Sequence, residues 1–164
     1  ADSTRFNAIN EFYKKNTSSQ PDYVIKLTDF HIELAQKKNN KKELIKALSE
    51  KSYVFYVKDN IKKSEEYIRE AIKIQITLND ELSLARLYTN LASICRAQSK
   101  FVETIKYYNY ALMIVKSSKD EKTEAAVLGN IGLVYFDLKN NEIPTQLQAY
   151  ISWAQKLWSR LKAN

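Results

Sequence analysis

Histidine and cysteine, the side chains that most often act as metal ligands or nucleophiles, each occur once in this chain of 164 residues. Because His31 is the only histidine, no metal site with two histidine ligands can form within one chain. We expect His31 to pack between helices rather than to act as a general acid or base. Cys95 has no second cysteine to pair with and falls in register with Phe55 and Tyr135, so we expect a small buried hydrophobic residue.

The glycines and carboxylates do not form a catalytic pattern either. Gly129 and Gly132 are the only glycines, and both fall within one helical segment, so the chain has no glycine-rich loop that could hold a phosphate. Glu65 and Glu66 stand beside lysines at helical spacing, where exposed ion pairs are expected. We therefore predict that the protein is not an enzyme and that it uses no metal and no cofactor.

The chain carries a net charge of +7 and has a pI near 9.3, which favours an acidic partner. Its lysines are scattered except at Lys37-Lys38, Lys41-Lys42 and Lys62-Lys63, and no zinc-finger or aromatic RNA-binding motif accompanies them. The expected partner is therefore a protein or an extended peptide of acidic character. Nucleic-acid binding through the basic surface is a minor alternative.

No segment approaches the roughly 20 consecutive apolar residues that a membrane span requires. The sequence begins at Ala1 without an initiator methionine, so we expect a fragment of a longer protein or the product of N-terminal processing. The cytoplasm is the favoured compartment, and the periplasm is the alternative if a signal peptide was removed before Ala1.

A forty-residue repeat organises the chain. It is clearest in three sets of equivalent positions: Leu48, Tyr88 and Leu128; Ser52, Ala92 and Gly132; Phe55, Cys95 and Tyr135. A period in this range is typical of solenoids, in which each unit buries its apolar face only against its neighbours. We predict a single domain over 1–164, with repeats at about 1–40, 41–80, 81–120 and 121–164.

Apolar residues inside each repeat recur at spacings of three and four, which indicates helices rather than strands. With only two glycines and two prolines, the chain offers few tight turns, and an all-α fold follows. Asp80 and Asp120 precede two of the periodic stretches and can cap them. The eight predicted helices are 3–15, 20–38, 41–57, 60–79, 81–98, 100–118, 121–138 and 142–163.

The pattern Asn90-Leu91-Ala92 with Cys95, followed by Phe101, Tyr108 and Ala111-Leu112, resembles the tetratricopeptide repeat (TPR). The resemblance implies a right-handed superhelical solenoid of about four antiparallel helix-turn-helix repeats. In that family a small residue allows the paired helices to touch, as at Ser52, Ala92 and Gly132 here. The period of about forty exceeds the family's usual thirty-four. Repeats of this length resemble those in the sensor regions of bacterial TPR histidine kinases and transcription regulators, although lengthened repeats also occur in eukaryotic scaffold proteins.

The resemblance also implies where a ligand would bind, because the first helices of successive TPR hairpins line a concave groove. On those helices the residues not committed to packing should point into the groove. They are Lys46, Ser49, Tyr53, Tyr56, Arg86, Asn90, Ser93, Arg96, Asn130 and Leu133. Glu50 and Asp137 fall on the same face. These residues suit a non-catalytic peptide-binding module, the sensory or scaffolding part of a signalling or regulatory protein.

Asn90 and Asn130 stand forty residues apart, at a position that holds the ligand backbone in related peptide-binding solenoids. An asparagine amide offers both a donor and an acceptor, so it can pair with the N–H and C=O groups of an extended peptide. Alternatively, each asparagine bonds a neighbouring helix or a local carbonyl. Both interpretations remain open at the level of sequence.

The last predicted helix carries two adjoining apolar stripes. Leu147, Ile151, Ala154 and Trp158 suit packing on the preceding helix, whereas a terminal helix should be polar on its outer side. The second stripe consists of Tyr150, Trp153, Leu157 and Leu161. It predicts contact with further repeats or a coiled connector of a longer protein, with the groove of a neighbouring molecule, or with a second copy of the chain, which makes self-association an alternative function.

Overall fold

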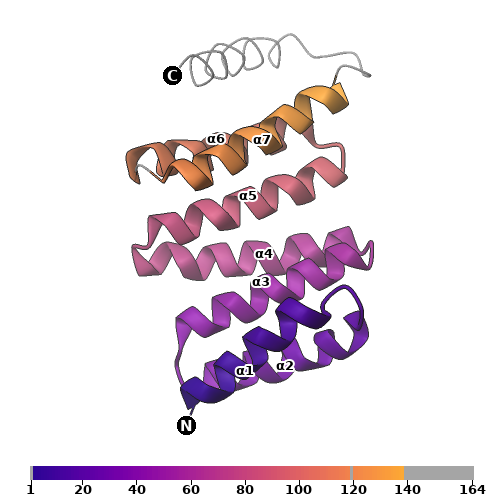
Figure 1. Cartoon of the computed structure of the whole chain (residues 1–164), viewed down its shortest axis with the longest axis vertical. Coiled ribbons are helices and arrows are strands. Elements are labelled where there is room, and N and C mark those ends of the chain that lie inside the picture. The colour runs from indigo at the N-terminus through magenta and orange to yellow at the C-terminus, as the bar shows by residue number, and fades with distance from the viewer. Residues whose placement is uncertain (1, 119, 139–164) are drawn as a thin grey trace. The chain divides into compact units, whose positions relative to one another are not determined.

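Helices account for all regular structure in residues 2–118 and 120–138, which are the residues that the computed structural model describes, without the side chain of Lys122. Figure 1 shows the seven α-helices of these residues, and a short 3-10 helix, η1 (Ile76–Leu78), extends α4. The α-helices are α1 (Asp2–Asn16), α2 (Pro21–Lys37), α3 (Lys41–Val57), α4 (Ile61–Gln75), α5 (Glu81–Ala97), α6 (Phe101–Ser118) and α7 (Glu121–Leu138). The all-α prediction is confirmed, and the predicted helix 142–163 lies outside the described residues.

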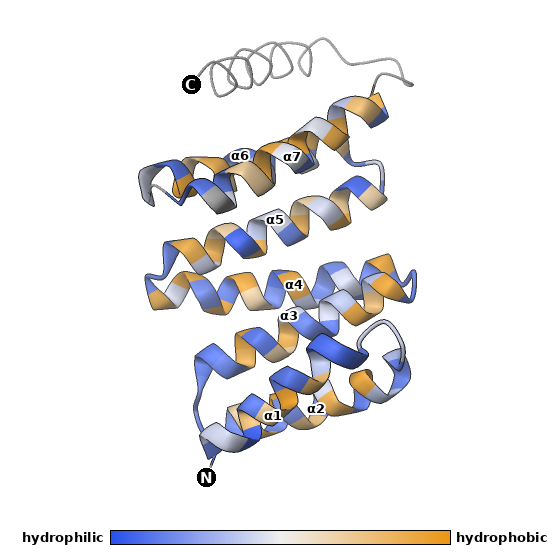
Figure 2. Cartoon of the chain, viewed as in Figure 1, coloured by the Kyte–Doolittle hydropathy of each residue, from blue (hydrophilic) through white to orange (hydrophobic). Residues whose placement is uncertain are grey.

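The chain divides into two compact units, residues 1–87 and 88–164. Helix α5 contributes its first residues to the first unit and its remainder, from Tyr88, to the second. Hydrophilic and hydrophobic residues follow one another along each labelled helix in Figure 2, as expected of amphipathic helices. The prediction of a single domain over 1–164 stays a prediction.

Every turn between helices from α2 to α6 contains one residue in the left-handed αL conformation, and these residues are twenty positions apart. They are Asn39, Asp59, Asn79 and Ser99, with φ angles of 49°, 57°, 52° and 57°. At the end of α3 the N–H of Asn60 donates to Phe55 O (2.8 Å) and that of Asp59 to Tyr56 O (3.0 Å), the pairing of a Schellman motif. The forty-residue repeat therefore consists of two half-repeats of equal length.

Four of the described helices are capped by the side chain of the residue directly before them, which is Asn40, Asn60, Asp80 or Asp120. Asp80 Oδ1 accepts a hydrogen bond from the N–H of Ser83 (3.1 Å), and Asp120 Oδ1 accepts one from Thr123 (3.1 Å), which confirms both predicted caps. Hydrogen bonds from Ser83 hold the pKa of Asp80 below its ordinary value. Asn40 and Asn60 cap α3 and α4 in the same way. These caps fix where the helices begin and hence the phase of each helix.

In the first unit α3 packs against both α2 and α4. The small-residue prediction is confirmed at Ser52, which is buried and whose hydroxyl donates to Ser64 O of α4 at 2.8 Å. Ile9, Tyr13 and Val54 form part of a core cluster that joins α1, α2 and α3. This packing fixes the side of α3 that stays accessible.

A stack of two rings and two ammonium groups joins α3 to α4. The rings of Phe55 and Tyr67 stack with centroids 5.5 Å apart. Lys51 Nζ lies 4.6 Å from the centroid of Tyr67, and Lys63 Nζ lies 5.1 Å from that of Phe55. Lys51 is buried and forms an ion pair with Asp29 of α2. This pairing satisfies its charge away from bulk water.

In the second unit Ala92, Tyr108 and Ala111 are fully buried, and α6 packs against α7. The burial of Ala92 agrees with the small-residue prediction for this repeat, and its contact with the paired helix stays a prediction. Gly132 holds the equivalent place on α7 but is exposed, and the helix expected to pack there lies outside the described residues. The role predicted for Gly132 therefore stays a prediction.

Candidate functional site

The groove residues predicted in the first unit lie on α3 and at the start of α5. Tyr53 and Tyr56 are 50% and 37% exposed, and Arg86 is also exposed. Lys46 Nζ donates to Glu43 Oε1 at 2.6 Å, so its charge is partly satisfied within the helix. Ser49 Oγ is buried and has no hydrogen-bonding partner among the described residues. Two tyrosines and Arg86 are thus accessible here, whereas Lys46 already has a partner.

The groove residues predicted in the second unit lie on α5 and α7. Asn90 is exposed, Asn130 is half-buried and Leu133 is 48% exposed. Ser93 differs, because its hydroxyl is 2.9 Å from the hydroxyl of Tyr108 and donates to Thr89 O at 3.1 Å. Its hydroxyl is engaged with α6, so Ser93 contributes to packing rather than to an open surface.

Arg96 pairs with Asp137, a residue that the sequence places on the same predicted face. The Nε of Arg96 on α5 lies 2.5 Å from Oδ2 of Asp137 on α7, and each side chain is 31% exposed. The two first helices of the hairpins in this unit are therefore joined by a charge-assisted hydrogen bond. Arg96 already has a carboxylate partner in the structure.

The two asparagines belong to a repeat position that has four members in the chain. The others are Asn10 and Glu50, which precede Asn90 by eighty and forty residues. Asn10 Nδ2 donates to Glu43 Oε2 at 3.3 Å, and the hydroxyl of Thr17 donates to Glu50. Burial raises the pKa of Glu50, against that hydrogen bond. Asn10 thus links α1 to α3, and Glu50 links α3 to Thr17, the residue directly after α1.

Asn90 and Asn130 form no side-chain hydrogen bond with the residues that the structure describes. Their surroundings differ in this respect from those of Asn10 and Glu50. An amide left without an internal partner keeps both its donors and its acceptor available for another molecule. Within the described residues, the open members of this repeat position are confined to the second unit.

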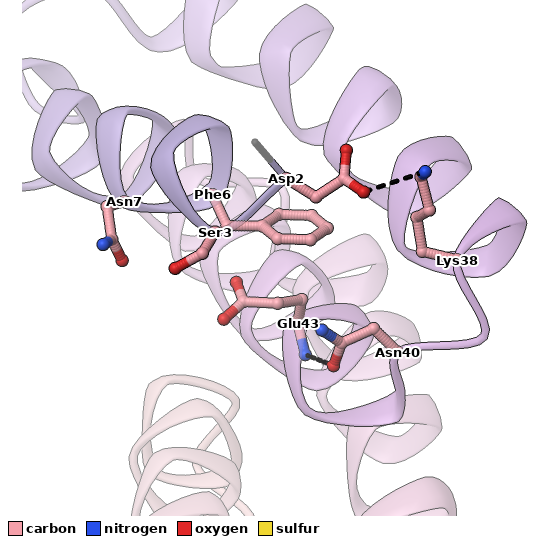
Figure 3. Close-up of a pocket in the computed structure, with 7 residues that line it drawn as sticks. All are labelled: Asp2, Ser3, Phe6, Asn7, Lys38, Asn40 and Glu43. Atoms are coloured by element: carbon pink, nitrogen blue, oxygen red, sulfur yellow. Dashed lines mark hydrogen bonds and ion pairs between the residues drawn. The ribbon is translucent and has the colours of Figure 1, made fainter.

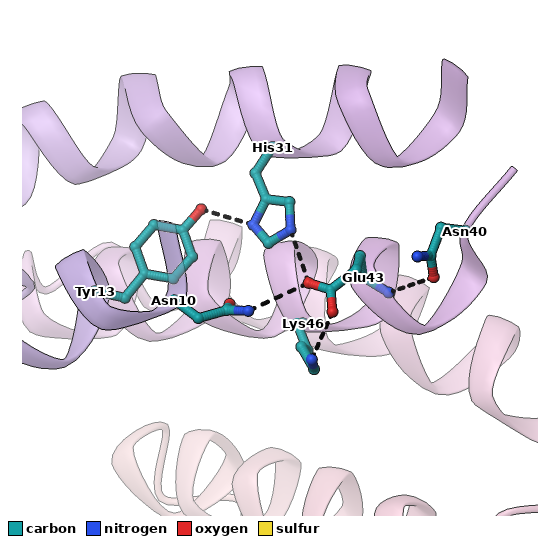
Figure 4. Close-up of polar contacts among 6 residues, drawn as sticks. All are labelled: Asn10, Tyr13, His31, Asn40, Glu43 and Lys46. Atoms are coloured by element: carbon teal, nitrogen blue, oxygen red, sulfur yellow. Dashed lines mark hydrogen bonds and ion pairs between the residues drawn. The ribbon is translucent and has the colours of Figure 1, made fainter. Parts of the chain in front are cut away.

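His31 lies at the centre of a buried polar network in the first unit (Figure 4). Its Nδ1 is 3.0 Å from the hydroxyl of Tyr13, and its Nε2 is 3.2 Å from Oε2 of Glu43. Because an ionised carboxylate only accepts, we assign the ring proton to Nε2 and let the hydroxyl of Tyr13 donate to Nδ1. The predicted packing role of His31 is confirmed, since its side chain is fully buried and lies against the ring of Phe6.

Burial sets the charge state of this network. It lowers the pKa of His31 more than the neighbouring Glu43 raises it, so the ring is held neutral. Burial also acts to raise the pKa of Glu43, but hydrogen bonds from Lys46 and Asn10 outweigh it and keep the pKa below its ordinary value. The network therefore combines a neutral imidazole with an ionised carboxylate and joins α1, α2 and α3.

A pocket of about 330 Å³ adjoins the network (Figure 3), and no pattern in the sequence pointed to it. Its lining residues are Asp2, Ser3, Phe6, Asn7, Lys38, Asn40 and Glu43. The charged members are already paired, since Lys38 Nζ lies 2.8 Å from Asp2 Oδ2 and Glu43 pairs with Lys46. We therefore assign no charged ligand to it.

Neither metal binding nor membrane spanning is indicated over the described ranges. Among these residues no group of three or more histidine, cysteine, aspartate or glutamate side chains could hold a metal ion. None of the described helices has the length and apolarity to cross a bilayer. The second apolar stripe predicted for self-association, Tyr150, Trp153, Leu157 and Leu161, lies outside the described residues.

The sequence matches no family model and no curated protein. Its fold is similar to that of solved TPR-like proteins. A Podospora anserina protein described as a kinesin light chain, with nearly identical TPR-like repeats, aligns with a TM-score of 0.73 and 11% identity over 98% of this chain and 73% of that chain. A substituted form of the same protein aligns with a TM-score of 0.66 and 11% identity over 81% of this chain and 64% of that chain.

BtubC (BKLC) from P. vanneervenii aligns with a TM-score of 0.56 and 19% identity over 84% of this chain and 66% of that chain. The matched segment thus spans between 64% and 73% of these three chains. At such low identity the likeness establishes the fold alone. The chain has the fold of a TPR-like helical repeat solenoid, as its sequence predicts.

Proposed function

We propose that this chain is a non-catalytic peptide- or protein-binding module whose ligand site lies on the second unit, at Asn90 and Asn130. One observation carries the proposal: these two members of a repeated position have no internal partner among the described residues, whereas Asn10 and Glu50 are hydrogen-bonded within the first unit. A TPR-like fold supports it, because stacked hairpins present such positions at regular intervals.

An extended peptide suits this pair of amides better than a compact ligand does. Each asparagine can donate to a backbone C=O and accept from a backbone N–H, so that two residues of the peptide are held without regard to their side chains. Leu133, half-exposed one turn from Asn130, supplies apolar contact beside the amide. Specificity would then come from neighbouring side chains, while the amides supply general affinity for peptide backbone.

Selection of peptides from a displayed library, followed by affinity measurement on the full chain, tests the proposal. Four hydrogen bonds worth about 0.5–1 kcal/mol each would be lost in Asn90→Ala/Asn130→Ala, about 2–4 kcal/mol together, so we expect the Kd of a selected peptide to rise at least about thirtyfold. Asn10→Ala is the matched control, because it removes the same amide at the same repeat position of the first unit. A selected peptide that binds the double variant as tightly as the parent would refute the proposal.

The exposed aromatic residues of the first unit fit the same class of ligand. Tyr53 and Tyr56 on α3 offer rigid contact area at low entropic cost, and Arg86 offers a charged contact for an acidic side chain. We propose them as additional contacts for a protein partner. Their replacement by alanine should weaken binding of a protein partner without affecting a short peptide held by the asparagines.

We further propose that the module is the sensory or scaffolding part of a bacterial signalling or regulatory protein, of the histidine-kinase or transcription-regulator type. The forty-residue period supports this context. A parent sequence that continues into a kinase or a DNA-binding segment would agree with it, and one that continues into a cargo-transport protein would refute it.

Self-association through the C-terminal segment is the second candidate, favoured by the two adjoining apolar stripes in residues 147–161. Trp153→Ala/Leu157→Ala should abolish dimers detected by light scattering and leave peptide binding unchanged. The asparagine variant should do the reverse. An unsubstituted chain that is monomeric at every concentration would eliminate this candidate.

A steep salt dependence of DNA affinity would instead support nucleic-acid binding.

A further inference from the structure

The contact between Arg96 and Asp137 breaks a local rule of helix stability. Asp137 stands one residue before the end of α7, where the partial negative charge of the helix terminus disfavours a carboxylate. Arg96, by contrast, lies in the last turn of α5, where a cation is favoured. The carboxylate of Asp137 therefore destabilises the end of its own helix, and the guanidinium of Arg96 on α5 offsets this charge through a hydrogen bond of 2.5 Å.

The repeat itself does not require this ion pair. At the equivalent positions of the preceding repeats the sequence has Asn16 with Val57, and Tyr56 with Ala97, neither of which can form an ion pair. The charged pair occurs in the unit where the repeated amide position is open. Because the pair joins α5 and α7, the two helices that carry Asn90 and Asn130, we connect it with the ligand site rather than with the packing of the solenoid.

The surroundings of the pair make it an exchangeable contact. Both side chains are 31% exposed, so water and a second carboxylate can reach them. Leu133 and Phe136, which flank Asp137 on α7, are 48% and 70% exposed. Ion pairs at such partly exposed positions contribute little net stability, because each charge is nearly as well solvated when apart. Replacement of one carboxylate by another at Arg96 therefore has a small free-energy difference.

We propose that Asp137 is a built-in competitor for the anionic group of the ligand, and that Arg96 is the residue that binds this group. This inference rests on the proposed function of the second unit. In the free protein the carboxylate of Asp137 occupies Arg96; on binding, a carboxylate of an acidic peptide takes its place and Asp137 turns to solvent. The ligand is thus an acidic extended peptide, and Asp137 sets how strongly the site discriminates against weakly acidic or neutral peptides.

Fluorescence anisotropy on the full chain tests the exchange with two labelled probes, an alternating Glu–Ala octapeptide and the matching Gln–Ala octapeptide. Asp137→Asn removes the competing carboxylate from a partly exposed ion pair, so it should bind the Glu–Ala probe about two- to fivefold more tightly than the unsubstituted chain does. Arg96→Gln should weaken binding of that probe, and Arg96→Gln/Asp137→Asn should show no gain over Arg96→Gln. Binding of the Gln–Ala probe should not respond to either substitution.

Three results would overturn the inference: no tightening in Asp137→Asn, tightening that persists without Arg96, or equal tightening for the Gln–Ala probe. Asp137→Ser provides a second variant if Asp137→Asn unfolds, and thermal unfolding of each variant separates a loss of fold from a change in affinity. The two proposals fail separately. A library peptide that depends on Asn90 and Asn130 but ignores Asp137 leaves the proposed function in place and eliminates the competitor.

Discussion

Replacement of Ser99 by glycine should stabilise the protein. Ser99 has a φ of 57° in the turn between α5 and α6, and it is the one αL residue of the four that is neither asparagine nor aspartate. An L-residue in this conformation costs roughly 1–2 kcal/mol, and asparagine and aspartate tolerate it best. Glycine removes the cost but adds about 0.4–1 kcal/mol of unfolded-state entropy. The expected net gain in the free energy of unfolding is about 0.5–1 kcal/mol.

Thermal unfolding followed by far-UV circular dichroism measures this gain. For a chain of this size it corresponds to a rise in Tm of roughly 1–4 °C. Ser99→Ala is the control, because it removes the hydroxyl but keeps the Cβ that makes the αL conformation costly, and it should show no rise. If Ser99→Gly is no more stable than Ser99→Ala, the backbone conformation at this turn is not a source of strain and the reasoning fails.

Three further predictions concern buried ionisable groups. Burial lowers the pKa of His31, so the unfolded chain binds the proton more readily and the free energy of unfolding should fall as the pH drops below about 6.5. In His31→Gln, the free energy of unfolding measured with urea should depend less on pH between about pH 7 and pH 5. Glu50 should affect the pH dependence of stability in the opposite direction, because its raised pKa makes protonation favour the folded state. Glu50→Gln should remove this contribution to the free energy of unfolding. Lys51→Met should cost about 1 kcal/mol in the free energy of unfolding, because the contact with Tyr67 and the ion pair to α2 are both lost, while the exposed Lys26→Met should cost less than about 0.5 kcal/mol.

The helices could be predicted closely because their boundaries are local. The bounds predicted for 41–57 and 121–138 coincide with those of α3 and α7, since a capping residue and an apolar period suffice to define each helix. The prediction 60–79 was too long at its end. There the α-helical geometry of α4 ends at Gln75, and the next three residues form the 3-10 helix η1. The side chain of Gln75 donates to Asp80 O at 2.9 Å, across the turn.

The candidate site was harder to predict because it depends on which side chains find partners in other helices. The sequence placed Arg96 and Asp137 on one face but could not show that they bond to each other. The burial of Lys51 was also missed, although its phase next to Leu48 and Ser52 could have indicated it. Asn10 was readable as a fourth member of the asparagine position, since it lies forty residues before Glu50.

The equal spacing of the αL turns bears on how such a chain can change in length. The four turns between α2 and α6 close with the same backbone geometry. Excision of the stretch from one of these turns to the second turn after it would therefore join two matching ends and keep the direction of the following helix. Loss of a single half-repeat would reverse that direction. Insertions and deletions in this protein should therefore be tolerated in whole hairpins, which makes the number of repeats easier to alter than the length of any one helix.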